Sequence, residues 1–252
     1  MKMGFQISSV RAYLSEPKQT QETIQKLACM GWKEMQMQWI APEVPDEVVA
    51  ESLKQNGIHA IGVQDKTDAV RQNLERMITQ NHLWGGRYLT TSGIPADCFT
   101  TEGLKCFAEE LQKLEQRLQS EGMLLTFHPI YSDYVPVDGK PAAEILLDLM
   151  PEMQLTLCVY HAVKGAVDPC RLLRKYAGRT DIVHLKNSVV LSDGREALMP
   201  VGQGNINWPP ILDVCRETGV KWVLAEQERW EKDAFLCMKE SYDYLKGLEL
   251  ES

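Results

Sequence analysis

Short apolar runs alternate with longer stretches of helical periodicity along the whole of this 252-residue chain. The apolar runs predict eight strands, at Phe5–Ile7, Met35–Met37, Ala60–Val63, Tyr88–Thr90, Leu124–Phe127, Leu155–Val159, Ile182–Leu185 and Trp222–Ala225. The periodic stretches predict helices at Gln21–Met30, Val48–Gln55, Ala69–Ile78, Leu104–Leu118, Ala143–Leu149, Arg171–Tyr176, Pro210–Arg216 and Ala234–Leu245. Strands that alternate with helices indicate a parallel sheet. Eight such pairs in about 250 residues are typical of a closed barrel. No low-complexity linker divides the chain, so we predict an α/β fold, a single-domain (β/α)8 TIM barrel over residues 1–252.

Glycine and proline support these boundaries. Gly31, Gly57 and Gly219 each follow a helical stretch and precede a strand, as expected of a helix C-cap. Asp168-Pro169 pairs a capping side chain with an early proline and predicts the start of a helix. A doubly wound open sheet would alternate in the same way, but no GxGxxG follows the first strand. The closed barrel is therefore favoured.

Amino-acid composition indicates which partners the chain can bind and in which compartment it is expected. The formal net charge is −8, so the chain lacks the basic footprint of a nucleic-acid-binding protein. Its seven cysteines are scattered without a CxxC pair, which favours reduced thiols in a cytoplasm. No stretch of 18 apolar residues and no signal-peptide pattern occurs. We expect a soluble, cytoplasmic protein that binds neither nucleic acid nor a membrane.

Three predicted strands end in side chains that bind metals or move protons. The stretches are CVYH at 158–161, VHLKN at 183–187 and LAEQE at 224–228. In an α/β barrel the C-terminal ends of the strands carry the active site. His184 ends an apolar strand and is a natural metal ligand or base, and Lys186 points to the same side. Glu226 also ends an apolar strand, and a buried carboxylate there requires a cation or a partner.

Other candidates lie near the same edge. Cys158 ends the sixth predicted strand, although a cysteine is often only a small core residue. His161 follows it within reach of a substrate hydroxyl. His128 begins the loop 128–141, which contains Asp133. This loop and the loop 186–209 exceed the usual length and favour a functional role. His59 and His82 lie at the opposite ends of their elements and are expected to be structural or surface residues.

Together these residues resemble the xylose isomerase-like TIM barrels, in particular the sugar phosphate isomerase/epimerase family. The resemblance is sharpest in VYHAVKGAVDPCRLLRKYAGRTDIVHLKN and MPVGQGNINWPPILDVCRETGVKWVLAEQE. It implies the barrel fold and one divalent cation, manganese, magnesium or zinc, at the barrel mouth. Carried onto this chain, it implies His184, Glu226, Cys158 and Asp133 as metal ligands. Family members often dimerise or tetramerise, so a homo-oligomer is also implied.

Several positions depart from the family pattern. Position 158 is cysteine where the family has aspartate, and HPIYSD places Asp133 near a usual glutamate. Neutral side chains replace the usual acidic or imidazole groups at Gln36, Gln64, Asn187, Gln203 and Asn207. Hard cations prefer carboxylates, whereas thiolates favour zinc and softer ions. The metal is therefore predicted to be different, weakly held or absent.

Two functions remain open on the sequence. The first is a sugar or sugar-phosphate isomerase/epimerase that uses metal-assisted proton transfer on a small carbohydrate-like substrate. In that case Glu226 with Asp133 or His128 moves the proton, and Lys186 or His161 steadies the developing negative oxygen. The alternative is a barrel without metal that acts as a sugar-binding or partner protein. A DNA endonuclease is disfavoured by the acidic charge and the few histidines.

Overall fold

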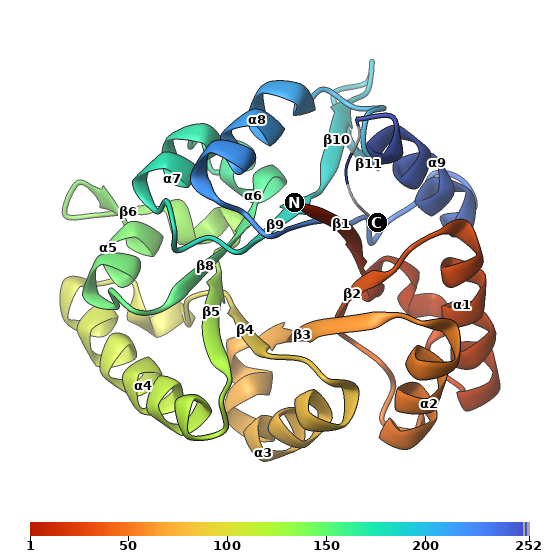
Figure 1. Cartoon of the computed structure of the whole chain (residues 1–252). Coiled ribbons are helices and arrows are strands. Elements are labelled where there is room, and N and C mark those ends of the chain that lie inside the picture. The colour runs from red at the N-terminus through yellow and green to blue at the C-terminus, as the bar shows by residue number, and fades with distance from the viewer. Residues whose placement is uncertain (249, 251–252) are drawn as a thin grey trace.

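The computed structural model describes residues 1–248 and 250 and consists of a closed parallel barrel surrounded by helices (Figure 1). The barrel strands follow the order β1-β12-β9-β8-β5-β4-β3-β2 around the ring. Their bounds are β1 Lys2–Gln6, β2 Glu34–Met37, β3 His59–Lys66, β4 Tyr88–Ser92, β5 Leu124–His128, β8 Gln154–Cys158, β9 Ile182–Leu185 and β12 Trp222–Ala225. The predicted (β/α)8 barrel is therefore confirmed.

The helices cover the outside of the barrel and bury its apolar strand faces (Figure 1). They are α1 Pro17–Met30, α2 Asp46–Asn56, α3 Thr67–Trp84, α4 Thr101–Ser120, α5 Ala142–Leu149, α6 Val159–Lys164, α7 Pro169–Lys175, α8 Trp208–Thr218 and α9 Ala234–Lys246. Within the described residues, no helix is both long and apolar enough to span a bilayer.

The helix boundaries follow the local signals in the sequence. Gly31, Gly57 and Gly219 end α1, α2 and α8 in the left-handed conformation, as predicted. The Asp168 carboxylate accepts a hydrogen bond from the backbone N–H of Cys170 at 2.8 Å and caps α7. Val159 was predicted to continue a strand, but it is the first residue of α6. The chain therefore turns away from the barrel immediately after Cys158.

The two long loops contain structure of their own. The loop 128–141 folds into a 3-10 turn, Tyr131–Tyr134, and a small hairpin of β6 (Pro136–Val137) and β7 (Lys140–Pro141). The loop 186–209 contains a hairpin of β10 (Asn187–Val190) and β11 (Glu196–Met199). Both segments follow the C-terminal ends of barrel strands, β5 and β9. They therefore begin at the mouth of the barrel.

Candidate active site at the barrel mouth

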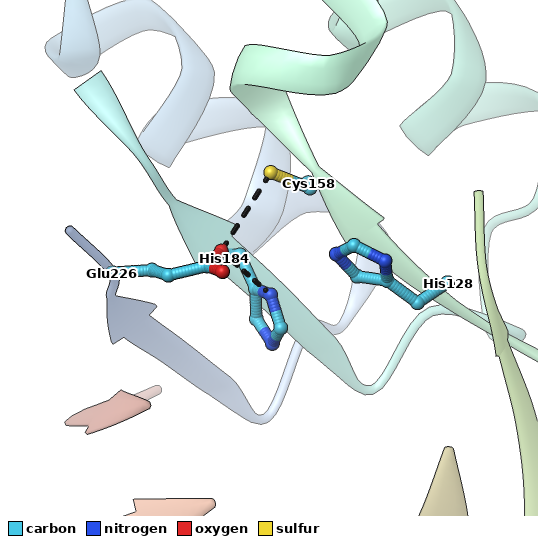
Figure 2. Close-up of side chains that lie close together, drawn as sticks. All are labelled: His128, Cys158, His184 and Glu226. Atoms are coloured by element: carbon cyan, nitrogen blue, oxygen red, sulfur yellow. Dashed lines mark hydrogen bonds and ion pairs between the residues drawn. The ribbon is translucent and has the colours of Figure 1, made fainter. Parts of the chain in front are cut away.

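Four buried side chains from four neighbouring strands meet at the C-terminal end of the barrel. They are His128, Cys158, His184 and Glu226, and one donor atom from each lies within 4.8 Å of the others. Figure 2 shows Cys158 and His184 turned toward the Glu226 carboxylate, with His128 approaching from β5. A tetrahedral zinc ion separates its donors by roughly 3.3–3.8 Å. Small side-chain rotations therefore bring all four donors within reach of one cation.

The hydrogen bonds of His184 fix which of its nitrogens faces the other three side chains. Its Nε2 donates to Gln36 Oε1 at 2.6 Å. The Gln36 amide is itself held, because its Nε2 donates to Thr90 Oγ1 at 3.0 Å. Nδ1 of His184 therefore carries the lone pair, as in metal sites where a second partner orients the ligating imidazole.

The lone pair of His184 points at a carboxylate. Its Nδ1 lies 3.1 Å from Glu226 Oε2. Burial, with a smaller effect from Lys186, lowers the pKa of His184 to about 3, so the ring is neutral and the contact is not an ion pair. Two electron-rich atoms then face each other without a proton between them. This arrangement fits a site for a cation.

His128 offers a second free nitrogen to the same site. Its Nδ1 lies 2.9 Å from the Ser92 hydroxyl, and its buried Nε2 has no hydrogen-bond partner among the described residues. Burial and the neighbouring His184 lower the pKa of His128 to about 3, which keeps the imidazole neutral. An unpartnered buried nitrogen is costly unless something binds it. The sequence had suggested His128 as a proton-transfer group, and its geometry suits a ligand as well.

Cys158 replaces a carboxylate with a thiol at the centre of the group. It is fully buried, and its Sγ lies 3.8 Å from Glu226 Oε2. Burial and the Glu226 carboxylate raise the pKa of the thiol well above its usual value. Without a cation the thiol therefore stays protonated and donates to Glu226. A bound metal would deprotonate it.

Lys186 and Glu228 complete the inner wall of the mouth. The Lys186 ammonium lies 3.6 Å from Glu226 Oε1 and forms a shorter ion pair with Glu228. Burial raises the pKa of both carboxyls, but the Lys186 ammonium outweighs it for Glu226, whose pKa is lowered. Burial and the Glu226 charge raise the pKa of Glu228 to about 7. The site thus contains two neighbouring carboxyls of unlike protonation near neutral pH.

These side chains border an open cavity of about 440 Å³. Its lining includes His128, His161, Lys186, Glu226 and Glu228. His161 Nδ1 accepts a hydrogen bond from the backbone N–H of Tyr131 at 3.3 Å, which leaves its Nε2 as a donor. Burial and the neighbouring His128 lower the pKa of His161, so this donor is neutral. The cavity can therefore offer a substrate an ammonium, an imidazole N–H and carboxyl groups.

Asp133 is not brought into this group. Its Oδ1 accepts from the backbone N–H of Ile94 at 3.1 Å, and its Oδ2 accepts from that of Ile130 at 2.8 Å. It thereby joins the loops that follow β4 and β5. The 3-10 turn points its carboxylate back at the backbone, whereas the spacing from His128 in the sequence suggested a ligand. Asp133 is therefore outside the four-donor group and fixes the loops instead.

The buried position of Asp133 leads to a prediction about stability. Burial raises the pKa of this carboxyl to about 7 from an ordinary value of 3.8. The folded state then holds the proton more tightly than the unfolded state, so this contribution to stability is present below about pH 4 and is lost as the pH rises toward 7. In urea unfolding from pH 4.5 to 8, the free energy of unfolding of wild type should fall by roughly 3 kcal/mol from this group, and Asp133→Asn should lack that fall. The exposed Asp213→Asn serves as control, and parallel curves for wild type and Asp133→Asn would contradict the prediction.

The remaining predicted positions have structural roles. The Asn187 amide donates to the carbonyl of Pro200 at 3.0 Å and fixes the base of the β10–β11 hairpin. His59 pairs with Glu34 at 2.7 Å and His82 with Glu121 at 2.9 Å, away from the mouth. Sequence reasoning missed the role of Gln36, which it treated as a lost acidic ligand. The available signal was a glutamine within a short apolar run, because a buried amide there needs a hydrogen-bond partner inside the barrel.

The fold and this site define a TIM-barrel protein whose mouth is polar and brings four possible metal donors together. The chain belongs to the xylose isomerase-like TIM barrel family, whose profile matches residues 36–247. A curated relative, inosose dehydratase of Clostridium tetani, is 27% identical over 171 residues. This alignment covers 60% of the chain and 55% of the relative, so the chain matches about half of that protein's length.

Solved structures show the same fold at low sequence identity. A sugar phosphate isomerase/epimerase from Parabacteroides distasonis superimposes with a TM-score of 0.81 at 17% identity, over 98% of both chains. An L-ribulose 3-epimerase gives a TM-score of 0.75 at 16% identity, over 99% of this chain and 95% of the other. A probable 3-DHS dehydratase from Bacillus anthracis gives 0.76 at 14% identity, over 98% and 99%. The neighbours therefore include isomerases, epimerases and dehydratases.

Proposed function

We propose that the protein is an isomerase or epimerase that moves a proton between carbons beside a carbonyl group of a small carbohydrate-like substrate. The observation that carries the proposal is that Glu226, one of the four donors, and Glu228, which lies outside the four-donor group, border the same cavity. A divalent cation held by His128, Cys158, His184 and Glu226 would supply Lewis acidity that polarises the carbonyl and hydroxyl oxygens of a substrate.

The proton transfer rests on the chain's own carboxyls. Glu226 has the lowered pKa and is the ionised carboxylate that accepts a proton from carbon. Glu228, with a pKa of about 7, can hold a proton and return it to the opposite face of the substrate carbon or to a substrate oxygen. It replaces Asp133 as the second carboxyl, because both oxygens of Asp133 are engaged by backbone N–H groups. Lys186, between the two glutamates, stabilises negative charge that develops on substrate oxygen.

One observation favours the second candidate function, a binding protein without metal. The Cys158 thiol donates to Glu226, so the group satisfies part of its own hydrogen bonding when no cation is present. Two features argue for the enzyme instead. His128 Nε2 has no hydrogen-bond partner in the described part of the chain, and the lone pair of His184 faces Glu226. The two functions differ in metal content and in chemistry at carbon.

Two measurements on the purified wild-type protein test the proposal. Elemental analysis should find a divalent metal near one equivalent per chain. Incubation with ketoses and aldoses in D2O should place deuterium on the carbon beside the carbonyl, detected by NMR, even where little net product accumulates. Metal without exchange would rule out the proton transfer. Absence of both, together with binding of a sugar in calorimetry, would establish the binding protein.

A further inference from the structure

A second cavity opens beside the mouth, between the ends of β2 and β3 and the helix α3. It has a volume of about 200 Å³. Gln38, Trp39 and Gln64 line both this side cavity and the mouth cavity. α3 departs from helical geometry at Asn73, which lies on the side cavity. A ligand that occupies the mouth can therefore extend past the two glutamines into the side cavity.

Both glutamines are buried, and their side-chain carbonyl oxygens have no partner among the described residues. Gln38 is 5% exposed and Gln64 is 3% exposed. Within residues 1–248 and 250, neither side-chain carbonyl oxygen has a hydrogen-bond partner. Buried amides are nearly always hydrogen-bonded, and those left free at a cavity wall are suited to a ligand. A primary amide both donates and accepts, so it pairs well with hydroxyl groups of either orientation.

Trp39 provides an apolar surface between the amides. Its backbone has a φ of 55°, a conformation that a bulky residue rarely adopts. The indole is held in place, because its Nε1 donates to Asp65 Oδ1 at 3.2 Å and the Arg11 guanidinium lies over the ring. Strain of this kind clusters at ligand sites. A rigid indole next to free amides suits the mixed C–H and O–H surface of a polyol.

The charges along the two cavities disfavour a phosphate group. The lining contains four acidic side chains, Asp65, Asp68, Glu226 and Glu228, and three basic ones, Lys66, Arg76 and Lys186. Arg76, the cation of the side cavity, pairs with Asp46 at 3.3 Å. Asp68 occupies the first turn of α3, where a phosphate would need the free backbone N–H groups. Among the lining residues, no set of unpaired cations is available for a dianion.

We propose that the side cavity is a subsite for the distal, hydroxyl-bearing end of an unphosphorylated substrate, recognised by Gln38 and Gln64. The proposal rests on the proposed function for the reacting end of the substrate and adds the substrate class. The two glutamines bind the distal end of the substrate, whereas Glu226 and Glu228 transfer the proton at its reacting end.

Calorimetric titration of matched probes tests the subsite. The probes are ketohexoses, aldohexoses and a cyclic polyol ketone, the 6-phosphates of the hexoses, and dihydroxyacetone as a three-carbon probe too short to reach the side cavity. Wild type should bind at least one unphosphorylated six-carbon probe about tenfold more tightly than its phosphate. Gln38→Leu and Gln64→Leu should each weaken that binding about tenfold and change dihydroxyacetone binding less than twofold. Gln112→Leu, on the exposed face of α4, is the matched control and should change neither.

Thermal unfolding separates a binding role from a structural one. Removing an unpartnered buried amide should leave the melting temperature of the free protein unchanged or raised. If leucine prevents folding at either position, Gln64→Met and Gln38→Met replace it. Tighter binding of the phosphates, no binding by any unphosphorylated six-carbon probe, or equal losses for the long and short probes would overturn the subsite. Deuterium exchange into dihydroxyacetone tests the proposed function separately, because this three-carbon probe is too short to reach the side cavity.

Discussion

Glu226→Gln is expected to remove both metal binding and proton transfer. The carboxylate has contacts with His184 Nδ1 at 3.1 Å and Lys186 Nζ at 3.6 Å, so one side chain serves the metal group and the lysine. Glutamine keeps the shape but neither the charge nor the basicity. We expect deuterium exchange to fall ~10³-fold or more, in the range that general acid–base groups contribute. Elemental analysis should show metal well below one equivalent per chain.

Glu228→Gln is the matched control because it tests the second carboxyl alone. Glu228 borders the cavity and pairs with Lys186, but it lies outside the four-donor group. This variant should retain its metal and lose exchange by ~10²-fold. Its exchange rate should also lose the pH dependence near 7 that the raised pKa of Glu228 produces in wild type. Equal metal loss in both variants would mean that Glu228 is a ligand, and full exchange in Glu226→Gln would exclude it as the base.

Most of the barrel could be predicted because its buried strands occur in the sequence as short apolar runs. The apolar runs that end at Leu185 and Ala225 are barrel strands with the same ends in the structure. The misassigned positions lie where the chain leaves the barrel. Val159 is apolar and β-branched and therefore resembles a strand residue, yet it begins α6. The β10–β11 hairpin sits within a loop that carries no strong alternation, and only pairing in three dimensions defines it.

The candidate site was predictable only in part. The residues at strand ends can be recognised from neighbouring residues in the sequence, whereas contacts across the barrel join residues that are far apart in the sequence. His184, Glu226 and Cys158 lie at or next to the C-terminal ends of adjacent strands, so their meeting follows from topology. The role of Gln36 depends on a contact with His184 across the barrel, 148 residues away in sequence. The direction of Asp133 depends on a 3-10 turn and on the backbone of Ile94. The orientations of the Gln36 and Asp133 side chains cannot be predicted from the spacing of residues along the sequence.

Cys158→Asp is expected to change which metal the protein prefers. In the proposed metal-bound state the wild-type donors are a thiolate, two imidazoles and a carboxylate, a set that favours zinc over manganese or magnesium. Aspartate in place of the thiol produces a harder site. Equilibrium dialysis against buffered mixtures of zinc and manganese, followed by elemental analysis, should show the zinc-to-manganese preference reduced by ~10²-fold or more. Cys158→Ser is the control, because it removes the thiolate without adding a charge and should lower zinc binding with no gain for manganese.

Two further readouts of the same variants distinguish ligation from simple packing. Because the buried thiol has a raised pKa, zinc binding to wild type must displace its proton, so zinc affinity should rise with pH more steeply in wild type than in Cys158→Asp. The metal-free aspartate variant places a second buried carboxylate beside Glu226, so it should unfold at lower temperature than wild type and recover when metal is added. A variant as stable as wild type without metal and indifferent to zinc and manganese would show that Cys158 is a core residue. In that case the four side chains form a hydrogen-bonded group, and the barrel functions in binding.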